Sequence, residues 1–427
     1  MAHTLVSADG PQSVPALLHR NAKQFANAPA YREKEYGIWQ SWTWAQTRDE
    51  VEALALGLLE LGANEGDFIA IIGRNRPYLY WAMMAAEMVG AVPVPLYQDA
   101  NAEEMAYVLD HCGARFVIAG DQEQVDKVLD VQGQLTQFER MIYLDPRGLR
   151  KYDHAALDQY SAVQDMGRKA RDKHIKELEA RQDKLDYDST GVMLYTSGTT
   201  GKPKGVVLSN RNIIETAKSS SAFDKLRQTD DILAYLPMAW VGDFAITVGA
   251  ALLWRFTVNV PERQETVVRD MREIAPTFYL AAPRSWDQML TTIQVGMENS
   301  TPFKKWLYHF FMDRAVAAET RKLNGKSGGA LEPLGRFLGE ALVFGPIKDQ
   351  FGMSRLKNAF TGGEAIGEDT FVFYRALGIK LRQLYGQTEN SAINAIQAPG
   401  EVRLHTVGKP APGVELKIAD DGEILMR

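Results

Sequence analysis

The segment Tyr195-Thr196-Ser197-Gly198-Thr199-Thr200-Gly201-Lys202-Pro203-Lys204-Gly205 follows a short apolar run, residues 191–194, that predicts a buried strand. It contains four small hydroxyl side chains, three glycines and two lysines. Glycines let backbone N–H groups turn toward an anion, hydroxyls donate to phosphate oxygens, and lysines add positive charge. The order is not that of the Walker loop, because Lys202 is followed by Pro203 and not by Ser or Thr. We therefore predict a strand followed by a loop that holds a polyphosphate.

Apolar runs of strand length alternate with helical patterns on both sides of this loop. Helical spacing is clearest at 51–61 and 76–89. Such alternation predicts an α/β fold, and a parallel sheet places ligands at the carboxyl ends of its strands, where the loop begins. The predicted strands are 68–72, 92–96, 115–119, 141–144, 191–195, 232–236, 256–260, 277–281, 342–345, 355–361 and 380–385.

The chain is long enough for two or three subdomains. We expect a first α/β subdomain over 1–186, a second over 187–400, and a change of pattern from 401 to 427. In that last part, two alternating runs flank Asp420-Asp421-Gly422 and predict a β-hairpin. The densely charged residues 167–188 predict an exposed helix with a narrow apolar stripe, and Gly and Pro at 323–335 predict a loop.

Composition narrows the classes of function. The chain is 45% hydrophobic and 24% charged, as in ordinary globular proteins, and its formal net charge of −6 offers no basic field for nucleic acid. Cys112 is the only cysteine, which excludes an intrachain disulfide and favours the cytoplasm. The two most apolar stretches, 81–97 and 232–260, are interrupted by charges and prolines, so we expect no transmembrane segment.

Two further segments, each at the end of a predicted strand, contain residues that could bind a ligand. Phe360-Thr361-Gly362-Gly363-Glu364 has paired glycines that let a flat ligand approach the backbone closely. In Tyr385-Gly386-Gln387-Thr388-Glu389, a tyrosine can stack on a purine and a carboxylate can bind Mg²⁺. Taken alone, such glycines are usually a turn, the tyrosine a packed aromatic and the glutamate a surface carboxylate.

The three segments, in this order and in a chain of this size, resemble the signatures of the acyl-adenylate-forming (AMP-binding) superfamily. This superfamily includes acyl-CoA synthetases, nonribosomal peptide adenylation domains and luciferases. The resemblance covers essentially the whole chain and is strongest to long-chain fatty acyl-CoA synthetases. It implies the fold of their large N-terminal domain: two helix-covered β-sheet subdomains, the second with the ATP and acyl sites, and the start of a small β-barrel.

The resemblance also implies roles for individual residues. Thr196 and Glu389 match the positions that hold Mg²⁺, and with Lys204 they are the expected catalytic residues. Lys204 matches the signature more firmly than Lys202. The loop residues that would cradle the β and γ phosphates are Ser197, Gly198, Thr199, Thr200, Gly201, Lys202 and Lys204. The remaining positions of the nucleotide site are Gly362, Gly363, Glu364, Gln383, Tyr385, Gly386, Gln387 and Thr388.

A fourth segment, residues 236–244, resembles the stretch that lines the acyl channel of fatty acyl-CoA synthetases. The expected acyl-binding residues are Trp240, Val241 and Phe244. Either Trp240 or Phe244 could be an aromatic gate, but an ordinary aromatic residue of the core fits each position equally well. The aromatic-rich stretches 234–256 and 286–311 favour a long lipid tail over a small polar acid.

The implied reaction joins a fatty acid to ATP, giving acyl-AMP and pyrophosphate, and then transfers the acyl group to coenzyme A. Alternatives within the superfamily are a synthetase for another carboxylic acid or a fatty acyl-AMP ligase. A noncatalytic nucleotide- or lipid-binding module is the alternative of another class. Seven histidines, among them His111, His154 and His309, show no metal-site spacing and are interpreted as structural.

Members of the superfamily continue beyond the position that matches Arg427. Their further segments include a ribose-binding aspartate and a small C-terminal domain with a lysine that assists adenylation. We therefore expect this chain to be the large N-terminal domain without that second domain, with low activity. A homodimer and peripheral contact with a membrane are left open.

Overall fold

The computed structural model describes residues 10–196, 201–326 and 332–427. Contacts divide the chain into two compact units: residues 1–218 with 234–260, and residues 219–233 with 261–427. The chain first leaves unit 1 within helix α8 (Asn210–Asp224). The boundaries predicted after residues 186 and 400 stay a prediction.

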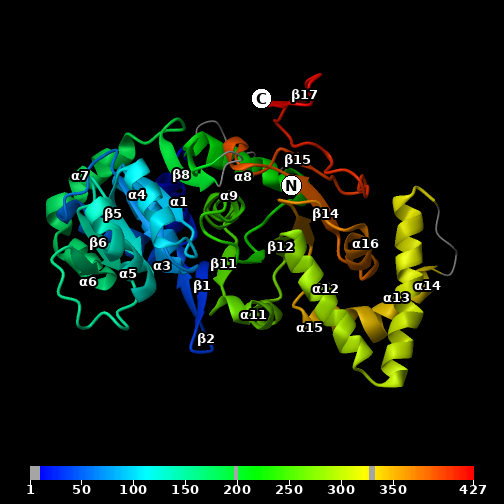
Figure 1. Ribbon diagram of the computed structural model, residues 1–427. Helices are drawn as coiled ribbons and strands as arrows, with labels where there is room; N and C mark the ends of the chain where they lie inside the picture. Colours follow the sequence, from blue (N-terminus) through cyan, green and yellow to red (C-terminus); the bar gives the residue numbers. More distant parts are fainter. Residues whose placement is uncertain (1–9, 197–200, 327–331) are drawn as a thin grey trace. The chain divides into compact units, whose positions relative to one another are not determined.

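A parallel sheet forms the centre of the first unit (Figure 1). Its strand order is β4-β3-β5-β6-β7, and every neighbouring pair is parallel. The inner strands β3 and β5 are nearly continuous apolar runs because helices cover both faces of the sheet. Met105 and Val125, on the helices beside β5, are fully buried against it. The strands are β3 (Phe68–Ile72), β4 (Val92–Leu96), β5 (Ala114–Ala119), β6 (Arg140–Tyr143) and β7 (Leu157–Gln159).

Helices of the first unit begin at clear start signals in the sequence. Thr43 and Gln46 form a reciprocal capping box at the start of α2, and Asn101 and Glu104 do the same for α4. Gly113 ends α4 in the left-handed conformation. The helices are α1 (Val14–Gln24), α2 (Trp44–Glu60), α3 (Pro77–Met88), α4 (Ala102–Cys112), α5 (Gln122–Val131), α6 (Tyr160–Lys169), α7 (Arg171–Asp183), α9 (Val241–Phe244) and α10 (Ala251–Trp254).

Two further groups of strands belong to the first unit. Strand β1 (Pro29–Glu35) pairs antiparallel with β2 (Ile38–Thr43) and parallel with β11 (Thr257–Val260). Strands β8 (Thr190–Thr196) and β9 (Lys204–Ser209) form an antiparallel pair. The helix predicted in the charged stretch 167–188 is confirmed as α7, with Leu178 buried on its apolar stripe.

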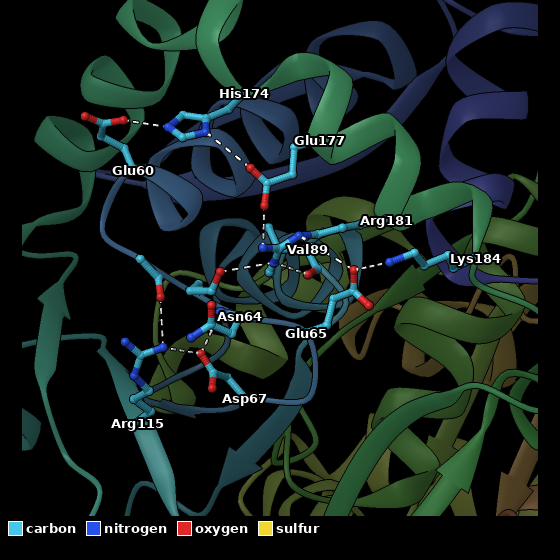
Figure 2. Close-up of polar contacts among 12 residues, drawn as sticks. Glu60, Asn64, Glu65, Asp67, Val89, Arg115, His174, Glu177, Arg181 and Lys184 are labelled. Carbon is cyan, nitrogen blue, oxygen red and sulfur yellow. Dashed lines mark hydrogen bonds and ion pairs between the residues drawn. The ribbon is translucent and has the colours of Figure 1, made fainter.

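Polar contacts hold α7 against the rest of the first unit (Figure 2). The guanidinium of Arg181 donates to the carbonyl oxygens of Ala63 and Val89, at 3.0 and 2.9 Å, and to Glu177 at 2.6 Å. His174, which the sequence did not single out, lies 2.6 Å from a carboxylate oxygen of Glu60. The charges on this helix are therefore partly structural.

The second unit contains a mixed sheet. Strands β10, β12, β13 and β14 are parallel neighbours in that order, and β15 and β16 continue the sheet antiparallel. A separate hairpin of β17 and β18 confirms the turn predicted at 420–422. The strands are β10 (Asp231–Leu233), β12 (Phe278–Ala281), β13 (Asn358–Thr361), β14 (Leu381–Tyr385), β15 (Ala395–Ile396), β16 (Lys409–Pro410), β17 (Leu416–Ile418) and β18 (Ile424–Met426).

Helices in this unit include a long hairpin of α13 and α14, drawn in yellow in Figure 1. The strand predicted at 342–345 is wrong: residues 340–344 form a π-helical turn that continues α14 into α15. A short apolar run does not distinguish a strand from a helix, and here it continues helical spacing from residue 334. Helix α14 also occupies part of the loop predicted at 323–335. The helices are α11 (Val267–Ile274), α12 (Pro283–Glu298), α13 (Pro302–Leu323), α14 (Glu332–Gly339), α15 (Gly345–Gln350) and α16 (Glu368–Ala376).

Among the described residues, no helix combines the length and the apolar character needed to cross a bilayer.

Candidate functional site

The strand pair β8–β9 brings the two ends of the glycine-rich loop together. Thr196, the last residue of β8, pairs with Lys204, the first residue of β9. Lys202 and Lys204 are both exposed. Ser197, Gly198, Thr199 and Thr200 lie outside the described residues. The paired strands thus place a threonine hydroxyl and an ammonium group on the two sides of the loop.

Helix α4 supports both sides of this loop. Its His111 lies with Nδ1 2.6 Å from the phenol oxygen of Tyr195 on β8. One turn earlier, the Tyr107 hydroxyl donates to the Pro203 carbonyl oxygen at 3.2 Å, and the Lys202 ammonium lies 4.7 Å from the centre of the Tyr107 ring. Burial raises the pKa of Tyr195, so its phenol stays protonated at neutral pH. The loop is therefore held at Tyr195 and at Lys202–Pro203 by one helix face.

In the second unit, two segments leave neighbouring strands at the same edge. Thr361, at the end of β13, pairs with Gln383 in β14, and the strands are parallel. Gly362, Gly363 and Glu364 follow β13, while Gly386 and the residues after it follow β14. Because parallel strands end at one edge of a sheet, the two predicted nucleotide-binding segments lie beside each other.

Backbone geometry explains the glycines in these segments. Gly363 has a φ of +92°, a conformation that disfavours residues with a Cβ atom. A Cβ on Gly386 would lie 1.6 Å from the Ala392 carbonyl oxygen, so the chain passes there only with glycine. Tyr385 is half-buried, and Glu389, in a short helical turn, is exposed.

The remaining nucleotide-site residues differ in their surroundings. Gln383 is buried, and its side-chain amide donates to the Leu404 carbonyl oxygen at 2.9 Å. Glu364 and Gln387 are exposed, and Thr388 is half-buried. Among the described residues, no three His, Cys, Asp or Glu side chains gather as a metal-binding group. Exposed lysines and hydroxyl groups can nonetheless donate to phosphate oxygens, and the glycines let a ligand approach the backbone closely. These residue types suit a magnesium-bound nucleotide.

The predicted acyl-binding residues lie at the start of α9 in the first unit. Trp240 precedes the helix and is half-buried, as is Val241, whereas Phe244 is buried. The Asn75 amide donates to the carbonyl oxygens of Ala234 and Leu236, at 3.0 and 2.7 Å, and so fixes the strand end that leads into this segment.

Comparison with known families decides the identity of the fold. The sequence model of the AMP-binding enzyme family matches residues 18–426. The chain belongs to this family. The resemblance predicted from the three segments is thereby confirmed, and so is the α/β fold of the large N-terminal domain of adenylate-forming enzymes.

Similar AMP-binding enzymes carry the names of fatty acid ligases. The chain is 25% identical to the long-chain-fatty-acid–CoA ligase ACSBG2 of Xenopus laevis over 97% of its own length, and 28% identical to the ligase FadD15 of Mycobacterium bovis over the same share. It spans 57% and 67% of the lengths of these relatives. The crystal structure of the long-chain-fatty-acid–CoA ligase FadD1 from Archaeoglobus fulgidus aligns with 99% of the chain, which covers 74% of that protein, with a TM-score of 0.73 and 18% identity.

Two polar groups of this chain were not predicted from its sequence. His111 was interpreted only as structural, and nothing in its local sequence connects it with a loop more than 80 residues away. Asp243 was noted only as an interruption of an apolar stretch. It is buried beside Phe244, where it accepts a hydrogen bond from the Tyr80 hydroxyl at 2.8 Å, and burial raises its pKa to about 8. The signal that could have marked it is that Asp243 is the only acidic residue between residues 232 and 260.

Proposed function

We propose that this chain carries the adenylation chemistry of a long-chain-fatty-acid–CoA ligase. The observation that carries the proposal is that curated relatives with this name match 97% of the chain, while the family model spans the segment 195–205. In the proposed reaction, a carboxylate oxygen of the fatty acid attacks the α-phosphorus of ATP and pyrophosphate leaves. The sulfur of coenzyme A then attacks the acyl carbon of the acyl-adenylate, and AMP leaves.

The roles of the loop residues follow from charge. Both reactants are anions, so the site has to supply positive charge and oriented donors to bring them together. We assign Lys204 and Lys202 to the phosphate oxygens, together with hydroxyl and N–H groups of residues 197–201. The pairing of Thr196 with Lys204 supports this assignment, because it brings a hydroxyl and an ammonium group to the same end of the β8–β9 pair.

In the second unit, Tyr385 would stack on the adenine, and the backbone at Gly362 and Gly363 would lie against it, with Glu364, Gln383 and residues 386–388 around it. Thr196 and Glu389 would hold Mg²⁺, which supplies charge for the leaving pyrophosphate. Trp240, Val241 and Phe244 would contact the acyl chain. We also propose a cytoplasmic location, which the single, buried Cys112 supports.

The proposal is tested by titrating the purified chain with ATP, with and without Mg²⁺, and by measuring fatty-acid-dependent exchange of pyrophosphate into ATP. We expect magnesium-dependent binding and exchange that requires the acid. Affinity for acids of increasing length should rise by about 0.8 kcal/mol per methylene until the pocket ends. Absence of nucleotide binding would contradict the proposal, and binding without any exchange would favour a noncatalytic module.

A further inference from the structure

The hairpin of α13 and α14 presents apolar side chains to solvent along both helices. On α13, Phe303, Trp306 and Phe310 are exposed, at 68%, 58% and 36% of their surfaces. Their spacing of three and four residues puts them on one face of the helix. The second helix and the π-helical turn after it repeat the pattern, with exposed Leu334, Phe337, Leu338 and Leu342. We call these seven residues the hairpin face.

Each row lies on the solvent side of its own helix. Helix α14 packs on α13 (Figure 1), and Gly339 of α14 faces Phe311 of α13, since an added Cβ would be 3.2 Å from the Phe311 ring. At about 100° per residue, the exposed row of each helix then points away from the side on which Tyr308, Met312 and Val343 are buried. Both rows of the hairpin face are therefore open to solvent.

This concentration of exposed apolar groups is unusual within the chain. Sixteen large apolar residues among the described ones have at least about a third of their surface exposed. Seven of the sixteen belong to the hairpin face, within forty positions of the sequence. Every Phe or Trp among the sixteen lies here. Phe303, Trp306 and Phe310 pack on one another, with ring centres 6.1 and 5.4 Å apart, which makes a continuous aromatic row. Large exposed apolar patches of this kind mark interaction surfaces.

The charge of the hairpin is opposite to that of the whole chain. Residues 302–339 contain seven Lys or Arg and three Asp or Glu, a net charge of +4, in a chain of −6. Arg314 continues the aromatic row, with its guanidinium 3.7 Å from the centre of the Phe310 ring. Aromatic and aliphatic groups next to lysine and arginine are typical of helices that lie in the interface of a negatively charged membrane.

We propose that the hairpin face binds the surface of an anionic lipid bilayer, with its aromatic and leucine side chains inserted at the headgroup level. A second copy of the chain is a weaker candidate, because a two-fold contact through this face would bring two hairpins of +4 together. The proposal does not rest on the proposed function, since it invokes neither ATP nor a fatty acid.

The test is flotation of the purified chain with vesicles of phosphatidylcholine alone or mixed with phosphatidylglycerol. We expect the chain to float with the mixed vesicles, less so at high salt. The double variant Phe303→Ser/Trp306→Ser and, separately, Phe337→Ser/Leu338→Ser should each weaken this binding about tenfold or more. Tyr36→Ser/Ile38→Ser, which changes two apolar residues of the first unit that are at least as exposed on average, is the matched control and should bind as the wild type does.

Far-ultraviolet circular dichroism and the thermal transition establish that the variants are folded, which their exposed positions favour. Lack of binding to anionic vesicles, or equal binding of the wild type and the hairpin variants, would overturn the proposal. Self-association of the chain in the absence of lipid would also overturn the proposal if both hairpin variants abolish it, because a second copy would then occupy the hairpin face. If high salt does not weaken the binding of the wild type to anionic vesicles, that result would also contradict the proposal, whatever the variants show.

Discussion

The Nδ1 atom of His111 lies 2.6 Å from the phenol oxygen of Tyr195, and this contact joins helix α4 to the strand that leads into the glycine-rich loop. Tyr107, on the same helix face, stacks on His111 with ring centres 5.4 Å apart and reaches the far side of the loop at Pro203. The two residues thus hold the first and last parts of the loop at a fixed separation. Positioning of this kind lowers the entropy lost when a phosphate chain binds.

We predict that His111→Phe weakens binding of Mg-ATP about fivefold, because one hydrogen bond is worth about 1 kcal/mol. His111→Gln retains a polar group and should restore most of the affinity. Calorimetric titration measures both values. If His111 acted only on stability, the two variants would shift the thermal transition and leave the dissociation constant unchanged.

The two lysines of the loop should differ in importance. Lys204 is exposed and paired across the strands with Thr196, whereas the Lys202 ammonium is already placed over the Tyr107 ring. We predict that Lys204→Ala lowers fatty-acid-dependent pyrophosphate exchange about 10²-fold, the usual effect of removing one electrostatic contact to a reacting group.

Lys202→Ala should lower the exchange rate less than Lys204→Ala does. Lys417→Ala, an exposed lysine on β17, is the control and should leave the rate unchanged. A larger loss from Lys202→Ala than from Lys204→Ala would reverse the assignment of the two lysines.

Local sequence predicted β3 and β4 well because each is an apolar run between breakers, but it missed the parallel strand β7, where only Leu157 of three residues is apolar. The strands predicted at 68–72 and 92–96 have those bounds in the structure. The error at 342–345 arose because four apolar residues fit a strand as well as a helix, and only the preceding turns of α14 settle the choice. Short apolar runs need such context.

The candidate site was predicted only where a signature lies within one segment. Thr196 and Lys204 belong to such a segment, and so do Gly363 and Tyr385. Contacts between distant segments were missed, such as that of His111 with Tyr195, because no local pattern encodes them. The roles of the site residues themselves remain predictions.

Two buried carboxyl groups of the first unit should make its stability depend on pH. Burial raises the pKa of Asp243 and of Glu87, each to about 8. Between their ordinary pKa near 4 and about 8, the folded state binds more protons than the unfolded state, so stability falls as pH rises. We predict that the free energy of unfolding decreases from pH 6 to pH 8, by up to about 1.4 kcal/mol per pH unit for each group.

Urea denaturation at pH 6 and pH 8 measures this slope. Asp243→Asn keeps a hydrogen-bond acceptor for the Tyr80 hydroxyl and removes the titration of this group, so it should reduce the slope to the contribution of Glu87. Lys184 lies in an exposed ion pair with Glu65, and Lys184→Met should leave the slope as in the wild type. A slope unchanged in Asp243→Asn would show that this carboxyl group is not its source.

Arg181 should be the most sensitive position of α7. Its side chain is only 11% exposed, and its guanidinium donates to the carbonyl oxygens of Ala63 and Val89 at the ends of two other helices (Figure 2). Arg181→Met keeps most of the side-chain volume but leaves both carbonyl oxygens without this donor, so we predict a loss of about 2 kcal/mol or more in the free energy of unfolding. Lys184→Met, three residues further along, removes an exposed ion pair and should cost less than about 1 kcal/mol. Chemical denaturation of both variants measures the two losses in the free energy of unfolding. Equal losses would mean that surface charge, and not the buried hydrogen bonds of Arg181, holds α7 in place.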